Sequence, residues 1–274
     1  MTLTDLYIYP IKSLGGIRLA EAVVEARGLR HDRRWLLVDE HSRFLTQRTD
    51  ATMARLAVAI EADELVVRHR ARPELGEVRV PLTAPDAAPM DVVIWDDTVP
   101  ALPVSAAADA WLSAALNRPV RLVYMPDTTR RAVDPDRPDR TPPGSVVSFA
   151  DAFPFLVIGQ ASLDHLNARL AARDESPVPM NRFRPNLVFS GGGPHDEDRW
   201  GDFRVGDIAF RGVKACARCV VVTIDQTTAQ AGKEPLRTLS QYRRDGAKVN
   251  FGQDAVALGT GVVRVGEEVV SSDE

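Results

Sequence analysis

The stretch NRFRPNLVFSGGGPHDEDRWGDFRVGDIAFRGVKACARCVVVTID, residues 181–225, alternates short apolar runs with loops rich in charge and glycine. Runs of Val, Ile, Leu and Phe bounded by Gly, Pro and Asp are typical of β-strands. The strands predicted here are RPNLVFSG (184–191), FRVGDIAFRG (203–212) and CVVVTID (219–225). The stretch also holds both cysteines of the chain, and NRFRPN places two arginines and two asparagines before an apolar run. Thiols and anion-binding side chains where strands meet loops indicate a site completed by other parts of the chain.

Short strands also dominate the sequence outside this stretch. They are predicted at 6–10, 34–39, 64–69, 77–82, 90–95, 120–125, 153–159 and 262–270. The few helices predicted are a turn at 52–56, a helix over 105–117 capped by Ser105, one that begins at Ser162 as its N-cap, and one over 235–245 with Pro235 in its first position. No βαβ alternation with a glycine fingerprint is present. The pattern predicts an α+β protein, mainly β, built on a barrel-like sheet.

Composition sets limits on function. The 274 residues suffice for one large domain or two modest ones. A net charge of −4 gives no general attraction to nucleic acid or to anionic membranes. No apolar run approaches the roughly 20 residues that span a bilayer, and the first residues lack the pattern of a secretory signal. We therefore expect a cytoplasmic protein with no nucleic-acid or membrane partner.

Residues 126–143, PDTTRRAVDPDRPDRTPP, differ in amino-acid composition from the rest of the chain. With five prolines, four arginines and four aspartates, this run is not expected to bury apolar surface. This composition predicts a long, mobile surface loop, either a lid over a site or a plain crossover.

Cys216 and Cys219 form a C-x-x-C pair, for which several interpretations compete. A structural zinc site needs a second pair of ligands, and neither another cysteine nor a suitable histidine pair is present. A redox pair usually opens a helix, whereas this pair leads into the predicted strand. A third interpretation is that both cysteines are small buried residues. Lys214 and Arg218 nevertheless flank Cys219, and nearby cations favour the metal-binding thiolate.

The arginines of NRFRPN form the second candidate group. In an extended segment alternate side chains share a face, so Arg182, Arg184 and Asn186 are expected to point together. Two guanidiniums and an amide on one face suit a phosphate group, although an ordinary solvated strand edge has the same composition. Near the N-terminus, YPIKS (9–13) and HDRRW (31–35) offer further anion contacts from Lys12, Ser13, Arg33 and Arg34.

Six segments in order resemble one family. They are YPIKS, HDRRWLLVD, FRPNLVFSG, ARCVVVTID, KEPLRTLSQYRR and NFGQ (250–253), and the resemblance runs from about residue 3 to about residue 270. The chain resembles MOSC-domain proteins that carry an MOSC N-terminal β-barrel, the group of the mitochondrial amidoxime-reducing component and its bacterial counterparts. The resemblance implies an N-terminal β-barrel domain over 1–120 packed on a mixed β-barrel MOSC domain over 121–274, which includes the 126–143 loop.

The resemblance also implies a molybdenum cofactor whose molybdopterin carries a dithiolene and a phosphate. The family's molybdenum ligand falls on Cys219, and Cys216 matches a second family cysteine that is not the ligand. Cofactor contacts carry over to Lys12, Ser13, Arg33, Asp151, Arg184 and Asn186, and Arg182, a candidate from its position in NRFRPN, is assigned to the same cofactor. Relatives have Thr-Ser where this chain has Ala152 and Phe153, and the mitochondrial relatives have tyrosine where this chain has Asp254. With no further cysteine, neither an Fe–S cluster nor zinc is expected.

The function implied is reduction of N-hydroxylated compounds, in which the oxygen of the N–O bond passes to molybdenum. Cys219 is then the catalytic ligand, the substrate is a small N-hydroxylated molecule, and electrons come from a separate ferredoxin, flavodoxin or reductase. MOSC domains also occur in molybdenum-cofactor sulfurases, so the alternative is a cofactor-binding or sulfur-carrier protein without reductase activity. A third alternative is a MOSC scaffold whose site is empty.

Overall fold

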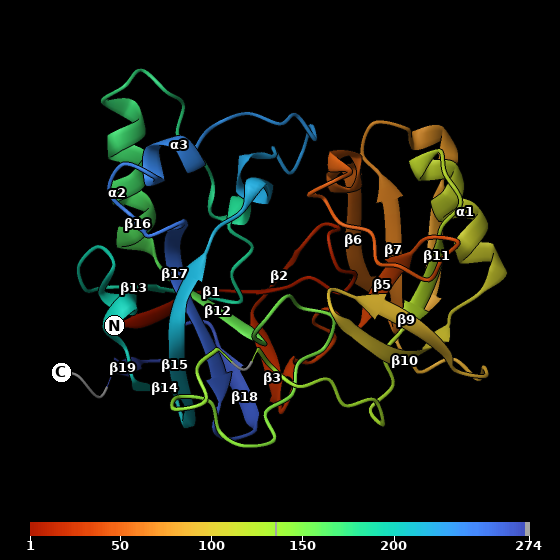
Figure 1. Cartoon of the computed structure of the whole chain (residues 1–274), viewed down its shortest axis with the longest axis horizontal. Coiled ribbons are helices and arrows are strands. Elements are labelled where there is room, and N and C mark those ends of the chain that lie inside the picture. The colour runs from red at the N-terminus through yellow and green to blue at the C-terminus, as the bar shows by residue number, and fades with distance from the viewer. Residues whose placement is uncertain (135, 272–274) are drawn as a thin grey trace.

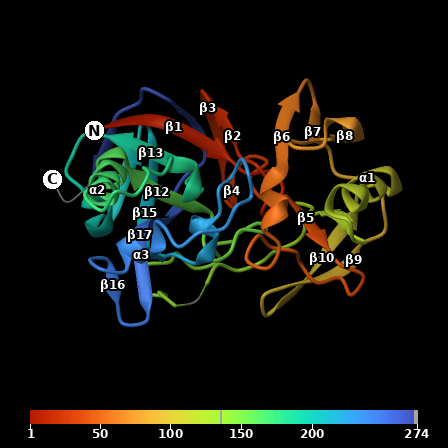
Figure 2. The same ribbon diagram turned by 90° about the horizontal axis from the view of Figure 1, so that it is seen from above.

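The computed structural model describes residues 1–134 and 136–271, which fold into two lobes (Figure 1). Both views separate a lobe made mainly of residues 35–124 from a larger lobe that contains the first strands and the second half of the chain (Figure 2). The described residues are mainly β with few helices, which confirms the fold class predicted from the sequence.

The larger lobe is built on a curved mixed sheet, which has nine strands within the described residues. Its order is β19-β14-β15-β17-β12-β13-β1-β2, with β16 beside β17. The strands are β1 (Thr2–Ile8), β2 (Ile17–Leu19), β12 (Phe155–Gly159), β13 (Leu187–Ser190), β14 (Asp202–Val205), β15 (Ile208–Ala217), β16 (Arg244–Asp245), β17 (Lys248–Ala257) and β19 (Val269–Ser271). The β12–β13 pair is parallel and its neighbours are antiparallel. A small sheet of β3 (Glu21–Glu25), β4 (Gly28–Leu29) and β18 (Gly261–Arg264) adjoins it.

The smaller lobe holds two further sheets and one long helix. One sheet contains β5 (Trp35–Val38), β9 (Met90–Ile94), β10 (Asp97–Pro103) and β11 (Arg121–Tyr124), and the other contains β6 (Leu56–Glu61), β7 (Glu64–His69) and β8 (Glu77–Pro81). Helix α1 (Ala106–Leu116) begins as predicted, because the Ser105 side chain accepts a hydrogen bond from the Ala108 backbone N–H. Its buried face of Ala108, Leu112 and Ala115 packs into a core that also contains Trp35.

The remaining helices are short or lie in the larger lobe. They are α2 (Gln160–Ala171), α3 (Leu236–Leu239) and the 3₁₀-helices η1 (Ala51–Arg55), η2 (Pro73–Leu75), η3 (Met180–Arg182), η4 (Asp196–Arg199) and η5 (Val220–Thr223). Within the described part of the chain, no helix has the length and apolar character needed to cross a bilayer.

The strand predicted over CVVVTID is wrong, because these residues form η5. Val222 N–H donates to the Cys219 carbonyl at 3.3 Å and Ile224 N–H to the Val221 carbonyl at 3.1 Å, so the chain turns on itself. The turn buries Val222 completely in the core beside Phe183. Hydrophobic contact with that core, rather than the β-propensity of the valines, decides the local conformation.

Three further predictions need correction. Helix α2 has Gly159 as its N-cap, and Ser162 lies inside the helix, where its hydroxyl donates to Glu197 Oε2 at 2.8 Å. The helix predicted over 235–245 is limited to α3. The run 262–270 is divided between β18 and β19, with Gly266 at a φ of 95° between them.

The 126–143 segment is irregular but attached to the fold. Arg131 is buried and donates to the Ser148 and Ala150 carbonyls at 3.1 and 2.6 Å. Val133 is buried as well, so the expectation that this run buries no apolar side chain is wrong. Its mobility stays a prediction, and Pro135 lies outside the described residues.

The first strands of the chain belong to the larger lobe. β1 pairs with β13 and β3 pairs with β18, so strands before β5 pair with strands from the second half of the chain. The division at residue 120 stays a prediction. The pairing carries the β1–β2 loop, with Lys12 and Ser13, to the centre of the molecule.

Candidate functional site

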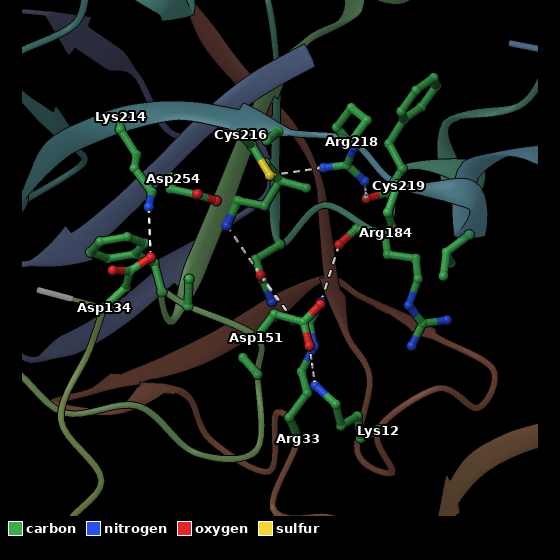
Figure 3. A pocket seen from close by; sticks show the side chains of 18 of the residues that line it. Lys12, Arg33, Asp134, Asp151, Arg184, Lys214, Cys216, Arg218, Cys219 and Asp254 are labelled. Carbon is green, nitrogen blue, oxygen red and sulfur yellow. Dashed lines mark hydrogen bonds and ion pairs between the residues drawn. The ribbon is translucent and has the colours of Figure 1, made fainter. Parts of the chain in front are cut away.

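A pocket of about 360 Å³ collects side chains from along the whole chain. Of the predicted site residues, it is lined by Lys12, Ser13, Arg33, Asp151, Arg184, Asn186 and Cys219. It is also lined by Thr46, Arg48, Asp134, Asp136, Ala150, Ala152, Phe153, Leu156, Phe183, Lys214, Cys216, Ala217, Arg218, Val221, Lys248 and Asp254. Figure 3 shows Lys12, Arg33 and Asp151 on one side and Lys214, Cys216 and Asp254 on the other.

Arg33 and Arg184 form the centre of the basic side. Both guanidiniums stack on Tyr9, at 4.4 and 4.2 Å from its ring centroid. Arg33 Nη1 donates to Asp32 Oδ2 at 2.5 Å, and Arg184 Nη1 donates to the Leu14 carbonyl at 2.8 Å. Burial, and then the charge of Arg33, lowers the pKa of Arg184 to about 10, so this guanidinium remains protonated at neutral pH.

Asn186 holds this arrangement in place. Its Oδ1 accepts from Arg33 Nη1 at 3.0 Å and from the Leu156 backbone N–H at 3.3 Å, and its Nδ2 donates to the Tyr7 carbonyl at 3.1 Å. Because both ends of the buried amide are engaged within the protein, Asn186 orients Arg33.

Lys12 and Asp151 join the N-terminal loop to the segment before β12. The ammonium of Lys12 donates to the Phe149 carbonyl at 2.8 Å and forms an ion pair with Asp151, which also pairs with Arg48 at 2.9 Å. Burial lowers the pKa of Lys12 to about 8, and Arg131 and Arg33 add to the effect. Burial alone would raise the pKa of Asp151, but the charges of Lys12 and Arg48 outweigh it and hold that pKa well below its ordinary value. The Asp151 side chain is half exposed, because it faces the open pocket.

Three residues of the pocket have left-handed backbone conformations. Ser13, Arg33 and Arg184 have φ values of 68°, 47° and 57°. Such conformations cost non-glycine residues about 1–3 kcal/mol each and concentrate at functional sites. Here Arg33 Nη2 donates to the Arg184 carbonyl at 3.2 Å, so the two conformations support each other.

The cysteine side of the pocket lies at the end of β15. The register of β15 against β17 shifts between Gly212 and Lys214 and again between Ala215 and Ala217, and such bulges redirect side chains. Lys214 and Cys216 consequently line the pocket with Cys219, which stands at the N-terminal end of η5.

Cys216 has a distinct environment from Cys219. Arg218 Nη1 donates to the Cys216 sulfur at 3.0 Å, and Arg218 Nη2 donates to the Phe183 carbonyl at 2.7 Å. Burial, followed by the charge of Asp254, raises the pKa of the Cys216 thiol to about 12. The sequence-based expectation that Lys214 and Arg218 act on Cys219 therefore needs correction: Arg218 contacts Cys216, and Lys214 pairs with Asp134 and Asp136.

Two predicted anion contacts lie away from the pocket. Arg182 does not share a face with Arg184, because η3 and the left-handed Arg184 interrupt the extended conformation expected from the sequence. Arg182 donates instead to the Val222 carbonyl at 3.1 Å and pairs with Asp225 at 3.4 Å. Arg34 is buried in the smaller lobe, where it donates to the Met125 carbonyl at 2.5 Å.

The sequence reasoning missed other members of the pocket. Arg48 and Thr46 come from the loop after β5, and Asp134 and Asp136 come from the 126–143 segment. No local motif marks them, although the lid interpretation of that segment pointed toward a site. The ring centroid of Phe153 lies 5.2 Å from Lys214 Nζ, and Phe153 packs with Val213.

The net formal charge of the pocket lining is opposite in sign to that of the whole chain. Seven basic side chains line it (Lys12, Arg33, Arg48, Arg184, Lys214, Arg218 and Lys248) against four acidic ones (Asp134, Asp136, Asp151 and Asp254). The pocket thus carries a formal charge of +3, whereas the chain carries −4. This arrangement suits an anionic ligand next to a thiol. Within the described residues, no group of three or more His, Cys, Asp and Glu side chains is placed to hold a metal ion.

Comparisons with known proteins identify the family of this chain. The family model of the MOSC domain matches residues 144–270, and that of the MOSC N-terminal beta barrel domain matches residues 1–119. The chain is similar to mitochondrial amidoxime-reducing component 1 of Mus musculus (32% identical, over 98% of this chain and 81% of that one) and of Homo sapiens (31%, over 98% and 82%). It is also similar to the molybdenum cofactor sulfurase of Oryza sativa subsp. japonica, with 30% identity over 91% of this chain and 32% of the sulfurase.

Proposed function

Because this chain belongs to the family of MOSC-domain proteins with an MOSC N-terminal beta barrel domain, we propose that it is a molybdenum-cofactor-dependent oxidoreductase of N-hydroxylated compounds. Its relatives are named amidoxime-reducing components and molybdenum cofactor sulfurases, which supports a protein related to the molybdenum cofactor. The observation that carries the proposal is the Cys219 thiol, which lines a pocket with a formal charge of +3.

The residues of the pocket fit the molybdenum cofactor. Molybdopterin carries a phosphate, and burial lowers the pKa values of Lys12 and Arg184, so these two cations are poorly hydrated and would gain from an anion. The buried Nε of Arg218 has no hydrogen-bond partner within the described residues, so a donor remains for a ligand. A single thiolate suits a metal that brings its other ligands with it, as a dithiolene does.

Each side of the pocket would have its own task. Cys219 would be the protein ligand to molybdenum. Arg33, Arg184, Lys12 and Ser13 would hold the phosphate, and Asp151 would orient Lys12 through their ion pair. Arg182, predicted as a contact from its position in NRFRPN, is left out of this assignment because it lies outside the pocket.

Reduction of an N–OH group to N–H consumes two electrons and two protons and releases water. When bound, the cofactor supplies the two electrons, and the protein binds and orients both it and the substrate. We further propose a small-molecule substrate, a separate electron-donor protein such as a ferredoxin, a flavodoxin or a reductase, and a cytoplasmic location.

The proposal is tested by expression in a host that makes the cofactor. Molybdenum and pterin are measured in the purified protein, and benzamidoxime reduction is assayed with a chemical one-electron donor. Cys219→Ser should abolish turnover, and the matched variant Cys216→Ser should retain both cofactor and activity. A wild-type protein without molybdenum or pterin would refute the proposal. A molybdenum-loaded Cys219→Ala variant with full activity would refute the ligand assignment.

A second candidate function is a carrier of the cofactor or of sulfur without reductase activity. Two thiols lining one pocket and 30% identity to a molybdenum cofactor sulfurase favour it. Mass spectrometry distinguishes the two, because a carrier would hold a persulfide on Cys219 and reduce no N-hydroxylated compound.

A further inference from the structure

Asp254 differs from the other acidic residues of the pocket in having no ion pair within the described residues. Asp151 pairs with Lys12 and Arg48, and Asp134 and Asp136 share Lys214. Lys214 is the β15 partner of Asp254 in the sheet, yet its ammonium turns to Asp134 Oδ2 at 2.7 Å and to Asp136 Oδ2 at 3.1 Å. The carboxyl group of Asp254 interacts with the Cys216 thiol instead, and its charge raises the pKa of that thiol.

The backbone fixes the position of this carboxyl group. Asp254 lies in the middle of β17, opposite Leu156 of β12 on one side and Lys214 of β15 on the other. Two residues earlier, Gly252 has a φ of 80°, and a Cβ there would lie 2.9 Å from the Val157 carbonyl oxygen and 2.7 Å from Ile158. Only glycine fits this close approach, which keeps β17 against β12. The carboxyl group is therefore held on the wall of the pocket by a sheet with partners on both sides.

Burial raises the pKa of Asp254 to about 6, although a hydrogen bond with the Cys216 thiol and the charges of Arg218 and Lys214 act in the opposite direction. The group is consequently mostly ionised at neutral pH, with its charge only partly compensated. A partly buried carboxylate without a cation gains from a ligand that donates hydrogen bonds to it. Figure 3 places it across the pocket from Lys12 and Arg33, so the proposed phosphate site and Asp254 do not compete for space.

We propose that Asp254 is the substrate-binding carboxylate of this pocket and that it selects N-hydroxylated amidines and guanidines. An amidoxime presents an amino group to such a carboxylate, and its reduced product is an amidinium cation that can donate two parallel N–H bonds. A hydroxamic acid of the same size presents a carbonyl oxygen at that position, which a carboxylate repels. This inference rests on the proposed reductase function for its turnover measurements but not for its binding measurement.

The test uses the full chain purified with its cofactor, as wild type, Asp254→Asn and Asp254→Glu. Asp245→Asn is the matched control, because Asp245 is exposed in β16 and outside the pocket. Calorimetry measures benzamidine affinity, and steady-state kinetics measures kcat and KM for benzamidoxime and benzhydroxamic acid. Because Asp254→Asn removes the charged partner of this hydrogen bond, we expect its benzamidine Kd and benzamidoxime KM to rise by about 10-fold or more. We expect the benzhydroxamic acid KM of Asp254→Asn to stay within about 2-fold or to fall, since the substitution breaks no bond to this substrate and removes the carboxylate that repels its carbonyl oxygen. Asp254→Glu, which keeps the charge, should retain part of the benzamidine affinity.

The outcomes separate this inference from the proposed function. Equal benzamidine affinity in wild type and Asp254→Asn would overturn the inference. So would an equal loss of activity on benzamidoxime and benzhydroxamic acid, since that indicates general damage to the site. If the wild type reduces neither compound, the proposed function fails, and the benzamidine titration still decides whether Asp254 binds amidinium groups.

Discussion

Replacing Asp254 by asparagine should stabilise the cofactor-free protein at pH 8 and leave its stability unchanged near pH 4. Asparagine has nearly the same shape but no charge, so the variant removes the cost of ionising a partly buried carboxyl group. The ordinary pKa of this group is 3.8, and burial raises it to about 6 in the folded protein. A tenfold change in proton affinity corresponds to about 1.4 kcal/mol, so the two pKa values give about 3 kcal/mol. Because the side chain is partly exposed to the pocket, this figure is an upper bound.

The sign of the effect follows from proton linkage. The folded state holds the proton more tightly than the unfolded state, so the wild type loses stability as the pH rises through about 4 to 6. Above about pH 6 both states are ionised and the difference between wild type and Asp254→Asn should be constant. Below about pH 4 both states are protonated and the difference should vanish.

Thermal unfolding measured by circular dichroism between pH 4.5 and pH 8 provides the assay. For a chain of this size, about 3 kcal/mol corresponds to a Tm increase of about 5 °C. Asp245→Asn, which removes an exposed charge, should show no such pH-dependent gain. An Asp254→Asn variant that is no more stable than wild type at pH 8 would refute the reasoning. A gain of the same size at pH 4.5 would refute it as well, because ionisation would then not be the cause.

Three further predictions follow from the packing and electrostatics. Gly212→Ala should lower the free energy of unfolding by more than about 2 kcal/mol in denaturant titration, because its Cβ would lie 2.3 Å from the Trp200 carbonyl oxygen, whereas Gly259→Ala, whose Cβ meets open space, should be nearly neutral. Ser105→Ala should cost about 1 kcal/mol in the same titration through loss of the α1 N-cap, and an unchanged stability would contradict the capping role. Sulfate affinity of the cofactor-free protein, measured by calorimetry, should fall as the pH rises through about 8, where Lys12 loses its proton; Lys12→Arg should remove this fall, and a pH-independent wild type would exclude Lys12 as an anion contact.

Sequence patterns were sufficient where short-range physics decides the structure. The α1 helix begins at its predicted cap because Ser105 and Ala108 are neighbours whose hydrogen bond needs no distant partner. The strand-rich pattern gave the mainly β fold for the same reason, since side-chain alternation and turn residues act locally. At CVVVTID and at Arg182, where the predictions are wrong, long-range contacts override local preference: Val222 is drawn into the core, and its carbonyl accepts from Arg182 at 3.1 Å.

The sequence by itself determined which candidate site residues are present, namely two thiols on one segment, a cluster of arginines before β13 and basic residues near the N-terminus. The tertiary structure alone decided which of them share a pocket. Pairing of β1 with β13 brings Lys12 and Ser13 to Arg184 from about 170 residues away, and the left-handed conformation of Arg184 turns its guanidinium onto Tyr9. The tertiary structure also leaves Asp254 without an ion pair among the described residues, because Lys214, its partner in the sheet, pairs with aspartates that lie about 80 residues earlier in the chain. Charge pairing depends on distance in space, and only the fold converts distance along the chain into distance in space.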